Sequence, residues 1–149
     1  MMKLSLGLST QEEEIQILTR FMGEDPIRHV TPVLSAEELM EERAQAARVY
    51  CAPVLIEYLA KLVVKTRTND RIRMGVSTRG SLAMLRAARG YAYLQGRSYV
   101  IPDDIRKLAV PVFAHRLMLA YGGGKEKEAR DILLAILDTV AVPTEDWKQ

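Results

Sequence analysis

The chain has 149 residues, 48% of them hydrophobic and 6% aromatic, which is enough apolar material for one domain with an ordinary core. Its single cysteine, Cys51, excludes an internal disulfide and a cysteine-based zinc cluster, and its two histidines lack His-x-x-x-His spacing, so we expect no metal site. No apolar run reaches the roughly 18 residues that a membrane span requires, and the first residues lack a signal-peptide layout. We therefore expect a cytoplasmic protein with no membrane partner.

The net charge of +2 conceals an uneven distribution along the chain. Residues 1–60 hold 5 basic and 10 acidic side chains, residues 61–116 hold 12 and 3, and residues 117–149 hold 4 and 6. The three segments therefore carry −5, +9 and −2. A middle segment this basic indicates a nearby polyanion, which could be nucleic acid, nucleotide phosphates or an acidic protein surface.

Capping signals predict the first two helices. Thr10 and Ser35 are each followed three residues later by a glutamate, which is the pattern of a capping box. Apolar residues then recur at helical spacing, so we expect helices over about 10–22 and 36–47.

The segments before and between these helices have different patterns. Leu4-Ser5-Leu6 alternates apolar and polar residues and is typical of the tail of a strand whose sheet is not visible in this sequence. Residues 24–34 contain two prolines and predict an extended, ordered connection.

Three further helices are predicted from proline starts and apolar spacing. Pro53 and Pro102 are well placed as first helical residues, Pro111 should kink or divide the helix that Pro102 begins, and a last helix should cover about 125–140. The residues expected to face the core are Leu55, Tyr58, Leu59, Leu62, Val63, Thr66, Ile105, Leu108, Ala109, Val112, Ile132, Leu133, Ile136, Leu137 and Val140.

The stretch Gly75-Val76-Ser77-Thr78-Arg79-Gly80 leads into a helix predicted over about 78–94. Ser77 is a good N-cap residue, because its hydroxyl can accept from the free amides of the first turn. Arg79 is then a cation at the helix end that ordinarily favours anions. From spacing alone, it is either a solvated side chain or the ligand of an anion.

The same helix offers a second arginine on the edge that carries Arg79. Arg86 falls about 20° from Arg79 on a helical wheel, and we expect small Ala83 and Gly90 beside this edge and Leu82 on the buried side. Arg86 is either a surface side chain whose stem covers apolar neighbours or a second ligand contact.

One apparent phosphate-binding motif is rejected. Gly122-Gly123-Gly124-Lys125 resembles a phosphate loop, but no strand with the required spacing precedes it, and Glu126 stands where a Ser or Thr would hold magnesium.

A set of short motifs in a fixed order resembles the C-terminal lid domain of a MoxR-type AAA+ ATPase over nearly the whole chain. The motifs are Asp25-Pro26, Val33, Ser35, Tyr58, Thr66-Arg67, Gly75-Val76-Ser77-Thr78-Arg79, Gly96-Arg97, Tyr99-Val100, Pro102-Asp103-Asp104 and His115-Arg116-Leu117. The resemblance implies an all-α helical bundle of about five to six helices, with a short extended segment at the N-terminus left from a core domain. It places the end of the linker at residues 1–9, the lid at 10–143 and a tail at 144–149.

In that family, the residue matching Arg79 is the sensor 2 arginine, which reaches from the lid to the phosphates of ATP. The resemblance gives Ser77 and Thr78 a supporting role in the first turn, and Arg86 a weaker claim to the nucleotide. The family often has Pro where Thr78 stands and Ala where Gly80 stands, so the first turn of this helix could be looser here.

The resemblance also implies a parent protein that binds ATP and magnesium. Such a parent is a ring-forming chaperone, commonly a hexamer, that remodels partners, often ones with a von Willebrand factor A domain. The chain itself has no Walker A motif and no Walker B strand, so we expect no catalytic residues and no ATP hydrolysis from it alone. The expected partners are a core domain and neighbouring ring subunits.

Two alternatives belong to other classes: a free-standing helical nucleic-acid-binding module and a helical adaptor for an acidic protein. Few aromatic residues and no recognition-helix pattern argue against the first, so we expect no nucleic-acid partner.

Overall fold

The computed structural model describes residues 1–120 and 126–144, and these form an all-α fold with one very small sheet. No helix in this part of the chain is long and apolar enough to cross a membrane. The elements in chain order are α1 (Gln11–Arg20), the 3-10 helix η1 (Pro26–His29), α2 (Ala36–Ala47), α3 (Pro53–Arg67), β1 (Ile72–Met74), α4 (Thr78–Leu94), α5 (Pro102–Phe113), the 3-10 helix η2 (Ala114–Arg116), β2 (Met118–Leu119) and α6 (Glu126–Thr139).

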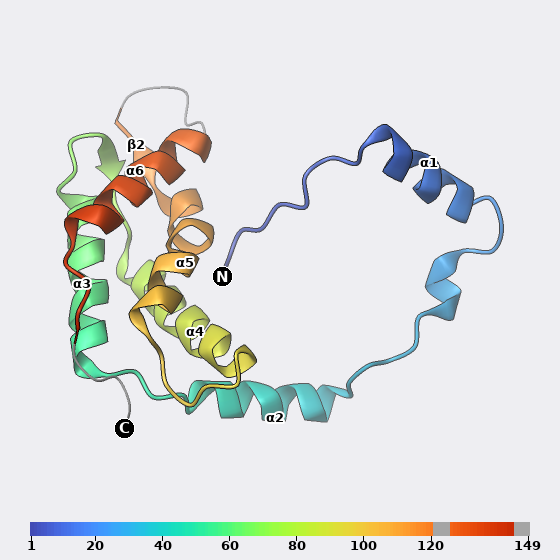
Figure 1. Ribbon diagram of the computed structural model, residues 1–149, viewed down its shortest axis with the longest axis horizontal. Helices are drawn as coiled ribbons and strands as arrows, with labels where there is room; N and C mark the ends of the chain where they lie inside the picture. The colour runs from blue at the N-terminus through green and yellow to red at the C-terminus, as the bar shows by residue number, and fades with distance from the viewer. Residues whose placement is uncertain (121–125, 145–149) are drawn as a thin grey trace.

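A compact body is formed by α3, α4, α5 and α6, and the earlier elements form an arm that extends away from it (Figure 1). The core of the body runs from Val49 to Val140 and includes the fully buried side chains of Tyr58, Phe113 and Met84. Every residue that the helical spacing predicted to face the core in α3, α5 and α6 is buried. Full burial of one such apolar side chain stabilises the fold by about 1.5–3 kcal/mol, so these stripes hold the body together.

Both capping boxes predicted for the arm are confirmed. The Thr10 hydroxyl accepts from the amide of Glu13, whose carboxylate accepts from the Thr10 amide in return, and Ser35 and Glu38 make the same exchange. The arm nevertheless buries almost nothing, and neither α1 nor α2 contains a buried residue. These helices are therefore specified by local sequence rather than by packing.

The arm is attached to the body at both ends. At its start, the Lys3 amide donates to the Pro111 carbonyl at 2.8 Å, and the Arg116 guanidinium donates to the Met1 carbonyl at 3.1 Å. At its end, the Tyr93 hydroxyl donates to the Glu42 carboxylate at 2.6 Å and brings α2 against α4. The residues between these attachments form the wide bow in Figure 1.

One expectation for the arm is wrong and one is untested. The sheet to which Leu4-Ser5-Leu6 would belong is not among the described residues, so the strand tail stays a prediction. Residues 24–34 are not extended throughout, because the Asp25 carboxylate accepts from the Ile27 amide and starts the 3-10 turn η1 at Pro26.

The body also contains a two-stranded antiparallel sheet that the sequence did not predict. It pairs Ile72 with Leu119 and Met74 with Met118. The body also contains an isolated parallel bridge between Tyr50 and Tyr99. Pro111 lies inside α5 two residues before its end, and the chain continues as the 3-10 turn η2, as the predicted division implies.

Candidate functional site

The start of α4 is the best candidate for a functional site. Ser77 is the N-cap residue, as predicted, with an extended backbone at φ −76° and ψ 165°. Its hydroxyl, however, makes no capping hydrogen bond, so that part of the prediction is wrong. Within the described residues, the backbone amides of Thr78 and Arg79 have no acceptor, and they point out of a helix end that carries partial positive charge.

The turn that leads into α4 is held by the end of α3. The Val76 amide donates to the Thr66 hydroxyl at 3.0 Å, and the Val76 carbonyl accepts from Arg67 Nε at 2.8 Å. Gly75 lies so close to α3 that a β-carbon there would be 2.6 Å from the Thr66 carbonyl oxygen. The turn therefore requires glycine at position 75 because of close approach.

Arg79 is exposed, and it makes no hydrogen bond or ion pair with any described residue. Arg86, two turns along α4, is exposed and likewise without such a contact in the described part of the chain. Both guanidinium groups are therefore available to an anion or an acidic surface. A guanidinium stays charged at any working pH and presents a planar set of donors that matches phosphate oxygens.

The buried side of α4 differs from the prediction. Leu82 is 51% exposed, whereas Ala83 is buried, so Leu82 and not Ala83 lies on the outer face with the two arginines. The buried residues of α4 are nearly all small: Gly80, Ala83, Met84, Ala87, Ala88 and Ala92. The core-facing side of the helix is thus the side on which neighbouring elements come closest.

Gly80 has a packing role. A β-carbon at this position would be 2.6 Å from Val76 Cγ1 and 3.4 Å from Arg116 Cδ. Arg116 is held in place by donating from Nε to the Val112 carbonyl at 2.9 Å. Gly80 therefore lets the first turn of α4 sit directly on Val76 and on the stem of Arg116.

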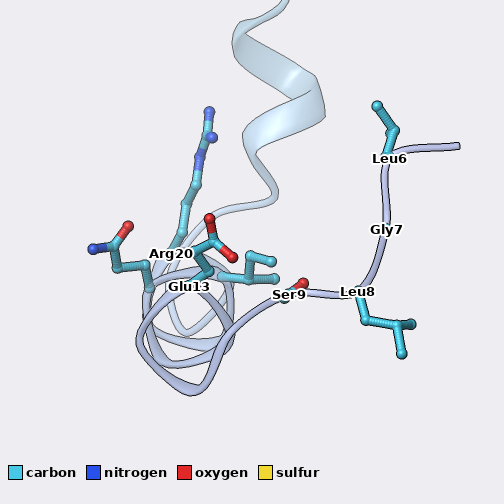
Figure 2. A pocket seen from close by; sticks show the side chains of 8 residues that line it. Leu6, Gly7, Leu8, Ser9, Glu13 and Arg20 are labelled. Atoms are coloured by element: carbon cyan, nitrogen blue, oxygen red, sulfur yellow. The ribbon is translucent and has the colours of Figure 1, made fainter.

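Two surface hollows lie near exposed apolar residues. A groove of about 270 Å³ between α3 and α4 is lined by Ile56, Leu59, Ala60, Val63, Val64, Arg67, Ser81, Leu82 and Leu85, and so borders the face that carries Arg79. A second, open hollow of about 570 Å³ lies on the arm, where the segment carrying Leu6 and Leu8 turns into α1 beside Glu13 and Arg20 (Figure 2). The second hollow is remote from α4 and contains none of the predicted site residues.

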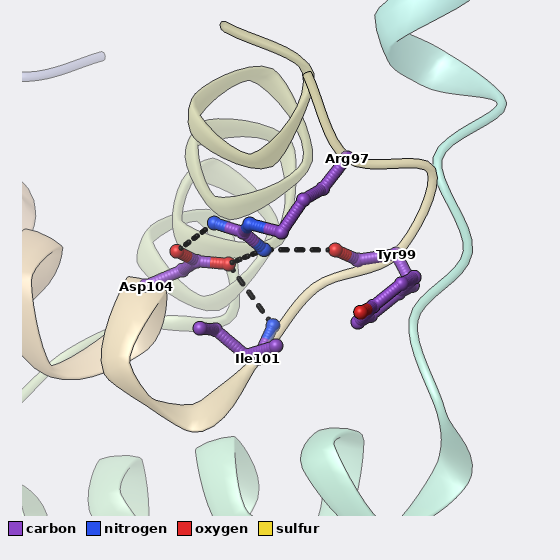
Figure 3. A network of polar contacts seen from close by, with 4 residues as sticks. All are labelled: Arg97, Tyr99, Ile101 and Asp104. Atoms are coloured by element: carbon purple, nitrogen blue, oxygen red, sulfur yellow. Dashed lines mark hydrogen bonds and ion pairs between the residues drawn. The ribbon is translucent and has the colours of Figure 1, made fainter. Parts of the chain in front are cut away.

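A buried ion pair fixes the opposite end of α4, and the sequence did not predict it as a contact. The Arg97 guanidinium holds both carboxylate oxygens of Asp104 at 2.6 and 2.8 Å and also donates to the Tyr99 carbonyl (Figure 3). The hydrogen bonds that Arg97 donates to the Asp104 carboxylate raise the pKa of Arg97 above its ordinary value. Asp104 also accepts from the Ile101 amide at the start of α5. The motifs Gly96-Arg97 and Pro102-Asp103-Asp104 are the sequence signal from which this ion pair could have been predicted.

The remaining predicted features are structural or lie elsewhere. Cys51 is buried, and this burial raises the pKa of its thiol. Arg89 donates to the Ala47 carbonyl at 3.4 Å, a contact between α4 and α2. The described residues contain no group of three or more His, Cys, Asp or Glu side chains that could hold a metal ion. The stretch Gly122–Lys125 and Trp147 lie outside the described residues.

Comparison with known proteins connects this geometry to a family. The model of the AAA lid domain family matches residues 64–136, which include the end of α3, all of α4 and the Arg97–Asp104 pair. Uncharacterized protein YeaC of Bacillus subtilis is 36% identical over 96% of this chain and 45% of its own length. Chaperone MoxR1 of Mycobacterium tuberculosis is 32% identical over 95% of this chain and 40% of its own length.

A solved structure agrees with these relatives. A candidate ATPase from Cytophaga hutchinsonii superposes with a TM-score of 0.83 at 28% identity, covering 97% of this chain and 47% of its own. The chain thus spans less than half the length of each of these proteins. It belongs to the MoxR-type AAA+ ATPases, of which it carries the lid domain.

Proposed function

We propose that this lid contributes Arg79 as the sensor 2 arginine of an ATP site whose other half lies on an AAA+ core domain. The observation that carries the proposal is an exposed guanidinium, without a partner among the described residues, on the first turn of a helix with free amides. A helix start and an arginine both favour an anion at the same place. The triphosphate of ATP is such an anion.

The residues present fit the phosphate part of this ligand. Arg79 and the amides of Thr78 and Arg79 supply donors only, whereas magnesium requires oxygen ligands that the core domain would have to provide. Ser77 supports the first turn through its backbone carbonyl, which accepts from the Gly80 amide at 2.8 Å. Arg86 is a weaker candidate because it lies two turns farther from the helix start.

Contact between Arg79 and the terminal phosphate would make the angle between lid and core depend on the nucleotide state. A lid coupled in this way can transmit hydrolysis to neighbouring ring subunits and to a client protein. The similarity to a chaperone supports remodelling of partner proteins, and the family resemblance suggests a hexameric ring and clients with a von Willebrand factor A domain. The cytoplasm is the compartment that we propose for such an assembly.

The test uses this chain joined to an AAA+ core domain. Arg79→Ala should weaken binding of a non-hydrolysable ATP analogue roughly ten- to hundredfold, because a charged hydrogen bond contributes about 1.5–3 kcal/mol. Arg86→Ala is the matched control, since it removes a cation from the same face and should have a smaller effect. Unchanged binding and turnover in Arg79→Ala would show that Arg79 is not the sensor.

Two measurements on the chain alone complete the test. Arg79→Ala should leave its free energy of unfolding within about 0.5 kcal/mol of the original, because an exposed side chain without contacts adds little stability. The nucleic-acid alternative predicts binding to duplex or single strands with a steep dependence on salt, whereas a lid predicts none.

A further inference from the structure

We infer that Thr66 and Arg67, the last two residues of α3, are positioning residues for Arg79. The Thr66 side chain is buried and the Arg67 side chain is exposed. They hold the peptide groups of Val76 and so fix the point from which α4 begins. This inference rests on the proposed function for its consequence in nucleotide binding. The mechanical part, that α3 anchors the start of α4, can be measured on its own.

The Thr66 hydroxyl acts both as a hydrogen-bond donor and as a hydrogen-bond acceptor. Oγ1 donates to the Val63 carbonyl at 2.6 Å and accepts from the Val76 amide at 3.0 Å. Thr66 is 1% exposed and Val76 is fully buried, so water does not compete for either bond. A valine at position 66 would keep the shape of this side chain and leave the Val76 amide buried without an acceptor.

Arg67 completes the attachment from the other side of Val76. Its Nε donates to the Val76 carbonyl at 2.8 Å, so consecutive residues of α3 bind the amide and the carbonyl of one residue. An N–H on a guanidinium arm can reach a carbonyl in this way, whereas a lysine ammonium is a compact charge on a flexible stem. We therefore expect Arg67, unlike the other surface cations of α3, to hold the Val76 carbonyl in place.

The attachment matters because the start of α4 lacks the usual side-chain cap. Ser77 makes no capping hydrogen bond, so the direction of the first turn is set by the residues just before it. Arg79 follows Val76 by only three residues, and Gly80 packs on the Val76 side chain. A shift of Val76 relative to α3 would therefore carry the base of Arg79 with it.

Thr66 cannot act by touching a nucleotide itself, because its side chain is buried against α3 and Val76. Its effect on any ligand must pass through the position of another group. We place that group at Arg79, the nearest exposed cation along the chain after the anchored residue.

The first experiment measures amide hydrogen exchange in this chain alone. Thr66→Val should speed exchange at Val76 and at Gly80 and Ser81, whose amides donate to the Ser77 carbonyl in the first turn of α4, by roughly tenfold more than at the amides of α5, which report general destabilisation. Thr66→Ser keeps the hydroxyl and should restore protection, and Lys65→Met removes a cation from α3 without touching the anchor. If Val76, Gly80 and Ser81 merely follow the α5 amides in Thr66→Val, the anchor does not exist and the inference is overturned.

The second experiment places the same variants in the chain joined to an AAA+ core domain. Thr66→Val should weaken binding of the ATP analogue several-fold when Arg79 is present and have no further effect in an Arg79→Ala background. Equal weakening in both backgrounds would show that Thr66 acts through the fold and not through Arg79, which refutes the positioning role. If Arg79→Ala alone leaves binding unchanged, the sensor proposal fails, and the exchange experiment still decides whether α3 anchors α4.

Discussion

Arg97 and Asp104 form a two-pronged ion pair in which each carboxylate oxygen receives its own guanidinium nitrogen, and the Asp104 side chain is only 2% exposed. The pair joins the turn after α4 to the first turn of α5, the two helices that pack most extensively on each other. It therefore closes the end of the body opposite to Arg79.

Removal of one member of this pair should strongly destabilise the chain. Asp104→Ala leaves the Arg97 charge partly buried and the Ile101 amide without its acceptor, so we expect a loss of about 3–5 kcal/mol in the free energy of unfolding. Urea denaturation measures this change in the free energy of unfolding. Asp103→Ala is the control, because Asp103 precedes Asp104 in the same helical turn and is exposed. Similar losses from both variants would contradict the assignment.

Two glycines in α4 should respond in opposite directions to the same substitution. Gly80→Ala places a β-carbon 2.6 Å from Val76 Cγ1, and Val76 is fully buried, so overpacking should outweigh the gain in helix propensity by about 1–3 kcal/mol. Gly90→Ala meets nothing within 4 Å and should stabilise the chain by about 0.5–1 kcal/mol. Thermal and urea unfolding of the two variants measure both changes in the free energy of unfolding. A stabilising effect of Gly80→Ala would refute the packing role of Gly80.

Helix content in the arm should depend on pH through the two capping boxes. The backbone amides of Thr10 and Ser35 lower the pKa of Glu13 and Glu38 below the ordinary value of 4.5. Because the folded pKa is the lower one, the stabilisation is complete above pH 4.5 and is lost as the pH falls through the folded values.

The measurement is far-ultraviolet circular dichroism during an acid titration. The double variant Glu13→Gln, Glu38→Gln keeps side chains that can still cap but cannot titrate. The difference in helix signal between the original chain and this variant should shrink as the pH falls below 4.5 and vanish below the folded pKa values of Glu13 and Glu38. A difference that stays constant with pH would contradict the link between these carboxylates and the arm helices.

The Cys51 thiol should react slowly with disulfide reagents in the folded chain. Its side chain is buried, and burial raises the pKa of the thiol, so the reactive thiolate is scarce and shielded. We expect an aromatic disulfide reagent to react at least about 100-fold more slowly with the folded chain than with the chain in urea. Cys51→Ser with Ser98→Cys provides an exposed thiol for comparison, and equal rates for the two positions would show that the region around Cys51 opens readily.

The helices could be predicted because their signals are local. Capping residues, proline starts and apolar spacing depend on neighbours within one or two turns, and the bounds of α2 and α4 agree with prediction to the residue. The sheet could not be predicted, because two- and three-residue strands show no periodicity and β1 and β2 are far apart in the chain.

The site was predicted in outline and not in detail. Spacing placed Arg79 at the start of a helix, but apart from Met84 the buried residues of α4 are alanines and a glycine. These residues are only weakly hydrophobic, so the helical wheel does not show clearly which side of the helix is buried. The Val76 contacts were also hidden, because bonds from a side chain to a distant backbone group leave no residue pattern.

The double attachment of the N-terminal bow changes how a partner would meet it. A free tail of the same length must lose the freedom of both its ends when it is captured, whereas here the Lys3 and Glu42 contacts already restrict where the exposed Ile15, Leu18 and Phe21 can be. A protein surface that covers these side chains therefore binds a segment whose ends are already held, with a smaller loss of conformational entropy than a free tail. The contacts of Lys3 and Glu42 therefore lower the entropic cost of binding a partner through the N-terminal bow.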